Sequence, residues 1–330
     1  FFRYSSPALY ADALARNARL ADYSIAVLNE NFSSSEFEYV RQDLGTLKIY
    51  RNTDDFERAL QVAEACRQWD IEFSGLSAAE VTTLEPALTP INSALAGGIH
   101  FPGDVSGDAH QFCISLAAAC DKAGVKFLYN TSVDELRLSN GRCDGARLNT
   151  EWQTFDTIVL AAGSYSTALA RSVALHIPVE PIKGYSITVP MSGWNVMPRV
   201  PVIDEHFHAA VCPLGEQLRV AGTAEFAGFD RQLRHARINN LFELLHQVYP
   251  QDAGHIDHDQ AERWSGLRPM TPDGVGVMGA SPVAGLCLTT GHGHLGWTMA
   301  PGAGKLVADV VIEQDTELPQ SDYAVARFKR

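Results

Sequence analysis

The spacing of apolar residues predicts the first helices and strands of the chain. Residues 7–29 form a strongly helical stretch, with leucine and isoleucine at mixed spacings, that ends near a polar serine run at 33–35. Residues 45–51 alternate as a strand does, and residues 54–69 have the pattern of an amphipathic helix. Ser77 and Glu80 have the spacing of a capping box, so another short helix is expected to begin there.

The next segment has the pattern of a parallel α/β unit. Asp108 is expected to cap a helix that runs through Lys122, followed by a short buried strand at 125–129 and a hairpin turn at 140–141. Residues 155–162 are an almost continuous apolar run closed by a glycine, which is typical of a strand buried on both faces.

Residues 178–269 return to alternating strands, interrupted by a helical pattern at 234–249. This predicts a mostly antiparallel sheet covered by a helix. The last segment, from about residue 286, again has α/β character, so one domain is expected to be inserted into another.

A glycine-rich turn between an apolar strand and a helix is the most informative motif. Gly291, Gly293 and Gly296 satisfy G-x-G-x-x-G within residues 286–311, and such a turn lets backbone N–H groups approach a negatively polarised ligand atom. No further strand with an acidic residue follows this helix. We therefore expect the turn to contact the end of a cofactor whose main phosphate site lies elsewhere.

Other motifs are weaker. A second glycine pattern at 274, 276 and 279 leads to Ala280-Ser281-Pro282 and is interpreted as a turn. Gly304-Lys305 is followed by Leu306, where a phosphate-binding loop needs serine or threonine. Three pairs of nearby histidines lack a cysteine or carboxylate cluster, so no metal site is predicted; they are His206/His208, His255/His258 and His292/His294.

Composition narrows the possible functions. The formal net charge is −13, and basic residues form no stripe, which argues against a nucleic-acid surface. No apolar run is long enough to span a bilayer and no signal-peptide pattern is present, so membrane contact would be peripheral. The 6 cysteines form no C-x-x-C motif and indicate reduced core residues of a cytoplasmic protein.

Five sequence strings, in order from about residue 44 to the end, resemble the D-amino-acid oxidase superfamily and most closely the bacterial D-amino acid dehydrogenases. They are VKFLYNTSVDEL, LAAGSYST, IPVEPIKGYSITVP, WSGLRPMTPDG and LTTGHGHLGWTMAPGAGKLVADVV. The resemblance implies a mixed α/β fold in which a Rossmann-like FAD-binding domain is interleaved with an antiparallel substrate domain.

The implied domain division has four parts. Residues 1–98 are expected to form a helical segment and the first part of the substrate domain, and 99–172 the middle of the FAD-binding domain. Residues 173–275 would complete the substrate domain, and 276–330 the FAD-binding domain. Family members begin with a strand and a glycine turn that hold the FAD pyrophosphate, and these do not precede Phe1. We expect that the sequence is truncated at its start or that another chain supplies this part.

The resemblance also implies site residues. Arg268 would pair with the substrate carboxylate, although an arginine before Pro269 can also stabilise a turn. Tyr185 would close the pocket and Lys183 would raise its positive potential, although both could belong to a half-exposed strand edge. The residues expected to contact FAD are Val133, Ala162, Gly163, Gly293, His294, Leu295, Gly296, Trp297 and Thr298.

The expected activity is oxidation of D-amino acids to 2-oxo acids and ammonia, with hydride transfer to FAD and electrons passing to a quinone-type acceptor. Peripheral association with the inner face of the plasma membrane is implied only by quinone-linked relatives. Two alternatives remain open. One is an oxygen-using oxidase of the glycine, sarcosine or hydroxyproline type, and the other is a non-catalytic subunit that needs a partner to bind FAD.

Overall fold

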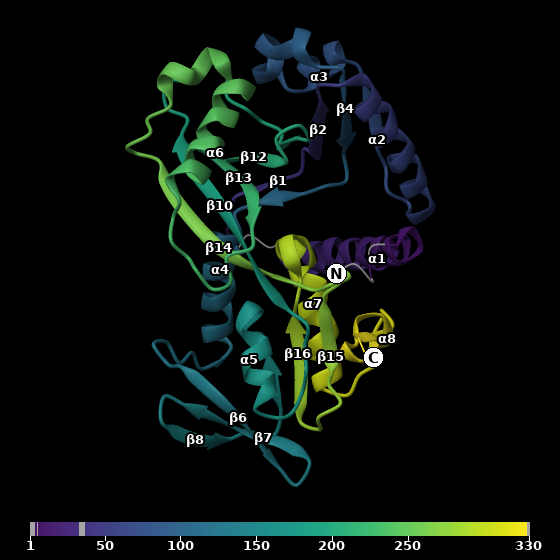
Figure 1. The fold of residues 1–330 in the computed structure, drawn as a ribbon, viewed down its shortest axis with the longest axis vertical. Helices are drawn as coiled ribbons and strands as arrows, with labels where there is room; N and C mark the ends of the chain where they lie inside the picture. Colours follow the sequence, from purple (N-terminus) through teal and green to yellow (C-terminus); the bar gives the residue numbers. More distant parts are fainter. Residues whose placement is uncertain (1–3, 5, 33–36, 329–330) are drawn as a thin grey trace.

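The computed structural model describes residue 4 and residues 6–32 and 37–328, so the serine run at 33–35 lies outside the described residues. Two bodies lie one above the other in Figure 1, the upper one built on a large sheet and the lower one on smaller sheets. Helices α1 (Pro7–Asn31) and α7 (Gly296–Val311) lie side by side where the bodies meet. The predicted mixed α/β class is confirmed.

The large sheet has eight strands in the order β14-β10-β13-β12-β11-β2-β4-β3. Only the pair β11–β2 is parallel within this sheet, which confirms the predicted antiparallel character. The strands are β2 (Thr46–Tyr50), β3 (Ser74–Leu76), β4 (Gly97–Phe101), β10 (Glu180–Pro190), β11 (Val202–Asp204), β12 (Ala209–Leu214), β13 (Gln217–Glu225) and β14 (Glu262–Met270).

Helix α6 (His235–Val248) covers one face of this sheet, as expected, and its apolar side chains join the largest core cluster. Tyr185, Ile187 and Val220 belong to the same cluster, so these residues of β10 and β13 point toward α6. Since side chains alternate along a strand, Gly184 and Ser186 face the opposite side of the sheet. This second face carries the cavity described below.

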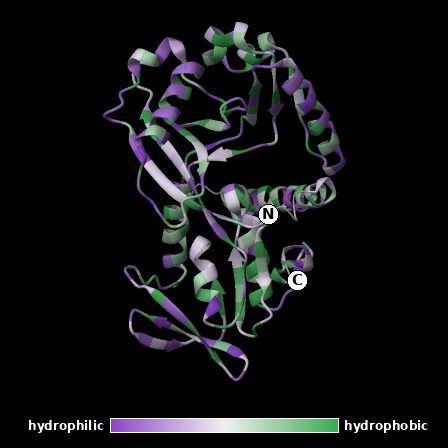
Figure 2. Cartoon of the chain, in the orientation of Figure 1, coloured by the Kyte–Doolittle hydropathy of each residue, from purple (hydrophilic) through white to green (hydrophobic). Residues whose placement is uncertain are grey.

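The lower body contains two three-stranded sheets, and a two-stranded ribbon lies apart from them. One sheet has the order β15-β16-β9, in which β9 and β16 are parallel. The strands are β1 (Arg41–Gln42), β5 (Ser106–Gly107), β6 (Val133–Ser139), β7 (Arg142–Leu148), β8 (Glu151–Thr154), β9 (Ile158–Leu160), β15 (Val277–Ala280) and β16 (Leu286–Thr290). Figure 2 shows apolar residues concentrated on β15, β16 and α7 in this body.

The helices begin largely where the sequence predicts. Ser77 and Glu80 form the expected capping box, and Asp108 accepts hydrogen bonds from the first amides of α4. The remaining helices are α1 (Pro7–Asn31), α2 (Thr53–Cys66), α3 (Ala78–Leu84), α4 (Ala109–Lys122), α5 (Ser166–Arg171), α7 (Gly296–Val311) and α8 (Gln320–Tyr323). Shorter 3₁₀ turns lie at Arg67–Trp69, Pro86–Ala94, Gly163–Tyr165, Pro250–His255, Gly293–Leu295 and Val325–Phe328.

Two strand predictions were wrong. Residues 125–129 form no strand and are exposed, because no described strand pairs with them. Residues 155–162 form a strand only at Ile158–Leu160, and Val159 is 42% exposed, so β9 is buried on one face alone. Apolar composition predicts burial, but a strand also needs a neighbour for its backbone hydrogen bonds.

Helix α1 packs along α7 and thereby joins the first part of the chain to the last. The amide of Gly302 in α7 donates to the hydroxyl of buried Ser24 in α1 at 3.0 Å. The division into segments at 98/99, 172/173 and 275/276 stays a prediction. Among the described residues, no helix combines the length and apolarity needed to cross a bilayer.

Candidate functional site

A cavity of about 650 Å³ lies on the face of the large sheet that points away from α6. The first turn of α4 and the turn before α7 contribute to its wall. Its lining residues are Ala109, His110, Gly184, Tyr185, Ser186, Thr188, Arg219, Ala221, Glu262, Trp264, Gly266, Leu267, Arg268, Pro269 and Gly293. The cavity therefore joins the predicted substrate residue Arg268 to the predicted cofactor turn at Gly293.

Arg268 is a cation without a carboxylate partner among the described residues. Its Nη1 donates to the backbone carbonyl of Thr223 at 2.8 Å, and burial lowers the pKa of its guanidinium. A partly buried guanidinium with free N–H groups is a suitable site for a planar carboxylate. Arg268 is therefore suited to bind an anion in this cavity.

Glycine makes room for this guanidinium. The side chain of Arg268 passes over Gly184, where a Cβ would lie 2.4 Å from Cζ. The neighbouring strand is irregular at the same point, because Lys183 pairs with Glu225 while Tyr185 pairs with Gly222. Two residues of β13 thus oppose Gly184 alone, which is the arrangement of a β-bulge.

The other two predicted substrate residues do not share the face of Arg268. Tyr185 lies in the core beneath α6, and its hydroxyl donates to Glu225 Oε2 at 2.6 Å. Lys183 is fully buried, with Nζ 3.4 Å from Asp230 Oδ2. Tyr185 nevertheless borders the cavity, and the expected roles of Tyr185 in closing the pocket and of Lys183 in raising its positive potential stay predictions.

The turn before α7 offers backbone groups to a ligand. Gly291 and Gly293 have φ values of 76° and 59°, which other residues rarely adopt. No side chain caps the first turn of α7 among the described residues, and that turn contains no acidic residue. The positive end of the helix dipole is therefore available to an electron-rich group.

His292 and His294 lie in this turn, but their environments differ. The imidazole of His292 lies against Gly276, and its Nε2 is 3.1 Å from Thr289 Oγ1. Burial lowers the pKa of His292 to about 4, so its ring is neutral near pH 7. Burial and the nearby Arg268 cation lower the pKa of His294.

The remaining predicted cofactor residues are not all together. The hydroxyl of Thr290 donates to the carbonyl of Gly163 at 2.9 Å, which brings the end of β9 beside the turn. Ala162 precedes this glycine, whereas Val133 begins β6 in the separate hairpin sheet. Trp297 packs edge-on against Phe112 of α4, with ring centroids 5.0 Å apart.

Thr298 in the first turn of α7 is exposed, and Leu295 just before the helix is half-buried against the core. Gly296 begins the helix, and a Cβ built on it would lie 3.7 Å from the Cβ of His292. These residues stay predicted cofactor contacts.

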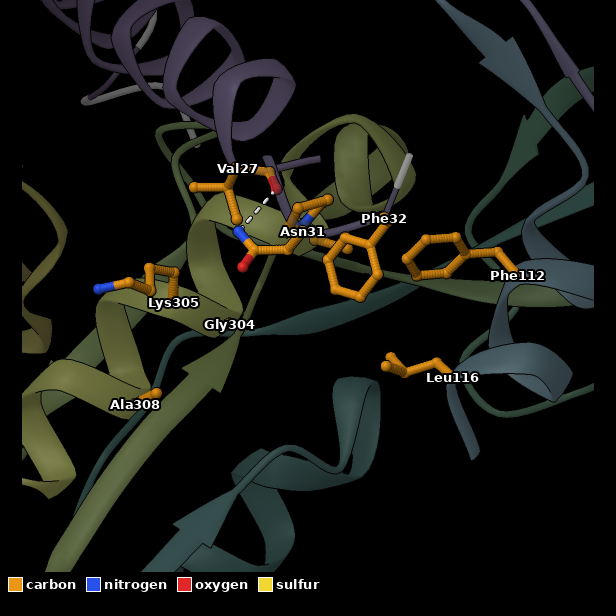
Figure 3. A pocket seen from close by; sticks show the side chains of 10 residues that line it. Val27, Asn31, Phe32, Phe112, Leu116, Gly304, Lys305 and Ala308 are labelled. Atoms are coloured by element: carbon orange, nitrogen blue, oxygen red, sulfur yellow. Dashed lines mark hydrogen bonds between the residues drawn. The ribbon is translucent and has the colours of Figure 1, made fainter. Parts of the chain in front are cut away.

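A second cavity of about 420 Å³ lies between α1, α4 and α7 (Figure 3). Its walls are mostly apolar and include Phe32, Phe112 and Leu116. Lys305 brings the only charge among its lining residues, and this amine is already paired with Asp309 at 2.6 Å. The second cavity therefore lacks a free charged group for catalysis.

The histidine pairs gain no further ligands in the structure. Across residues 6–32 and 37–328, no group of three or more His, Cys, Asp or Glu side chains is arranged to hold a metal ion. All six cysteines have free thiols, but only Cys143 and Cys287 are buried, so the expectation that the cysteines are core residues was wrong for the other four.

Sequence reasoning missed Thr223 and Glu225. Their importance depends on pairing between strands that are about 40 residues apart, and no local motif marks either one. It also interpreted Gly276 as a turn residue alone, whereas the structure shows that this glycine leaves space for His292.

Comparison with known proteins agrees with this arrangement. Residues 2–310 match the model of a family described as FAD dependent oxidoreductase. Glycine oxidase from Geobacillus kaustophilus has a similar structure, with a TM-score of 0.84 at 23% identity over 99% of this chain and 85% of that one.

Two other solved structures are similar. L-proline dehydrogenase from P. horikoshii has a TM-score of 0.83 at 18% identity, covering 95% of this chain and 83% of that one. Iminodiacetate oxidase from Chelativorans sp. BNC1 has a TM-score of 0.82 at 24% identity, covering 95% and 84%. At these identities the similarity establishes the fold alone.

Proposed function

Because the chain belongs to the FAD dependent oxidoreductase family, we propose that it oxidises D-amino acids to 2-oxo acids and ammonia. The observation that carries this proposal is Arg268, a guanidinium without a carboxylate partner among the described residues, in the same cavity as the Gly293 turn. The five sequence strings that resemble D-amino acid dehydrogenases support the D-isomer and a quinone-type electron acceptor.

The residues around the turn fit FAD. The uncapped N-terminus of α7 and the left-handed glycines before it leave backbone N–H groups facing outward. Reduced flavin carries negative charge on its pyrimidine ring, which a helix N-terminus stabilises. Gly293, His294, Leu295 and Gly163 are the residues that would hold FAD here. Bound FAD supplies the hydride acceptor.

The chain's own residues then bind and orient the substrate. Arg268 holds the substrate carboxylate, and the carbonyl of Thr223 holds Arg268. A carboxylate fixed at this point places the substrate in the same cavity as Gly293. The amino group must be neutral when Cα loses its hydride, and the resulting imino acid is hydrolysed by water. Orientation and electrostatics supply most of the acceleration in this scheme.

The test is an absorbance scan near 450 nm of the purified protein under anaerobic conditions. D-alanine, L-alanine and glycine are added in separate samples. Bleaching by D-alanine alone supports the proposed reaction and its stereochemistry. Bleaching by glycine, with hydrogen peroxide formed when air is admitted, would instead favour the oxygen-using oxidase.

Reoxidation identifies the acceptor. If a soluble quinone restores the 450 nm absorbance band of the flavin faster than air does, the protein is a dehydrogenase and not an oxygen-using oxidase. A folded protein that binds no flavin at all would support the alternative of a subunit that needs a partner.

A further inference from the structure

We propose that Lys183, Tyr185 and Glu225 position Arg268 from the opposite face of the sheet, by fixing the bulge in β13. This inference rests on the proposed role of Arg268 in carboxylate binding. It assigns Lys183 and Tyr185 a positioning role in place of substrate contact. The connection runs from Glu225 through two residues of backbone to the Thr223 carbonyl, and from there to Arg268.

The first step is the geometry of the bulge. Thr223 and Ala224 together oppose Gly184 on β10. Thr223 has a φ of 66°, which is strained for a β-branched residue. This conformation turns the Thr223 carbonyl to Arg268, whose Nη1 lies 2.8 Å away. A regular antiparallel residue would direct its carbonyl to the neighbouring strand or to the sheet edge.

The second step is the set of side-chain contacts made by Glu225, the residue that follows the bulge. Glu225 is the next residue to resume pairing, opposite Lys183. Its Oε2 accepts a hydrogen bond from Tyr185 at 2.6 Å and lies 3.7 Å from Lys183 Nζ. Its Oε1 lies 3.1 Å from Arg234 Nε. Three side chains therefore restrain one carboxylate from different directions.

Burial explains why this carboxylate cannot move freely. Lys183 is fully buried and the Glu225 side chain is 14% exposed, so moving Glu225 away would take one of two carboxylates from a buried amine. Asp230 is the second carboxylate within reach of Lys183, at 3.4 Å. The hydrogen bond from Tyr185 lowers the pKa of the Glu225 carboxyl, which keeps it ionised at neutral pH.

The third step links the two faces. Backbone strain persists only where the surrounding structure holds it. Here the restraint on Glu225 lies two residues from the strained Thr223, and the strained residue supplies the only hydrogen bond that the Arg268 side chain makes to a described residue. We infer that loosening Glu225 lets the bulge relax and withdraws the carbonyl from Arg268.

The experiment measures binding of propionate, which has the carboxylate of D-alanine without the amine. Isothermal titration calorimetry on the flavin-loaded protein compares wild type with Tyr185→Phe, which keeps the ring and removes the hydroxyl. Tyr249→Phe is the matched control, since Tyr249 lies in the same core and its hydroxyl has no hydrogen-bond partner among the described residues. Glu225→Gln is a second variant in case the first is unstable, and thermal melts verify folding.

Tyr185→Phe is expected to raise the Kd for propionate about tenfold, and Tyr249→Phe to leave it unchanged. With D-alanine, Tyr185→Phe should raise KM by a similar factor and change kcat less than about twofold, because the carboxylate contact is made in both ground and transition states. In an Arg268→Ala background, Tyr185→Phe should cause no further loss, since it acts only through Arg268.

An unchanged Kd in folded Tyr185→Phe and Glu225→Gln overturns the inference. So does an equal loss in the Arg268→Ala background, which would mean that Tyr185 acts independently. A third outcome separates the two proposals. In it, wild type binds propionate through Arg268, and Tyr185→Phe weakens that binding only when Arg268 is present, while no D-amino acid is oxidised. In that case the proposed reaction fails and the positioning role stands.

Discussion

The guanidinium of Arg268 lies over the backbone of Gly184, so close that a Cβ at that position would be 2.4 Å from Arg268 Cζ. Both nitrogens at the end of the fork would be 2.5 Å from the same point. The two residues come from neighbouring strands of one sheet, with Arg268 opposite Ile182 in β10. The absence of a side chain at Gly184 therefore allows Arg268 to lie flat along the cavity wall.

Gly184→Ala should impair substrate binding more than folding. The clash is with the end of a flexible side chain, which can move away, so the free energy of unfolding should change by less than about 1 kcal/mol. Moving the guanidinium should raise KM for D-alanine about tenfold or more. Gly254→Ala, where a Cβ meets no atom within 4 Å, is the control for steady-state kinetics and denaturant unfolding. Normal KM in Gly184→Ala would contradict the placement of Arg268.

Removing the guanidinium should be more severe. Arg268→Ala is expected to lower kcat/KM for D-alanine by about 100-fold or more, because a charge-assisted bidentate contact is lost. Arg268→Lys should recover only part of this, since an ammonium lacks the planar fork. Anaerobic stopped-flow reduction of the flavin measures both variants, and activity equal to wild type in Arg268→Ala would exclude a carboxylate role.

His292 should make stability depend on pH. Its pKa in the folded protein is about 4, below the ordinary value of 6.5, so the neutral form stabilises the fold. This contribution is complete above about pH 6.5 and is lost as the pH falls toward 4, by up to about 3 kcal/mol.

Denaturant unfolding at pH 7, 5.5 and 4.5 measures this effect. His292→Gln should reduce the slope of unfolding free energy against pH, while His235→Gln, a change at an exposed histidine of α6, should not. A slope unchanged by His292→Gln would mean that the burial of this ring has no energetic consequence.

The contact between α1 and α7 can be tested with two glycines of one helix. A Cβ on Gly302 would be 2.6 Å from Ser24 Oγ and 3.1 Å from the Ser24 backbone amide nitrogen. Gly302→Ala should therefore destabilise the protein by about 1–3 kcal/mol. Gly304→Ala meets nothing within 4 Å and should be neutral or stabilising by up to about 1 kcal/mol. Equal melting temperatures for the two variants would refute the close packing of α1 on α7.

Local sequence was sufficient for many elements of this fold. Ser77 and Asp108 are N-caps because their side chains bond to amides a few residues away, which requires no tertiary structure. The same is true of the hairpin turn at 140–141 and of the strand, turn and helix around Gly293. These features are determined within about one turn of chain, so the sequence alone predicts them.

The direction of side chains in the site depended on tertiary structure. Lys183, Gly184 and Tyr185 are adjacent in the sequence, but a period of two residues sends the glycine to the Arg268 face and the other two to the α6 face. Which face is which follows from register, and a shift of one residue would reverse it. The sequence pointed to a strand that lines the cavity without determining which of its side chains would enter it.

The bulge at Thr223 and the exposure of residues 125–129 show the same limit. Tyr185 and Glu225 are 40 residues apart, and only the antiparallel pairing of β10 with β13 brings them together. An apolar run such as 125–129 becomes a strand only when another strand accepts its hydrogen bonds, and none of the described strands does. Sequence therefore determined the elements and the chemical groups, and tertiary structure decided which groups meet, because long-range pairing sets both register and burial.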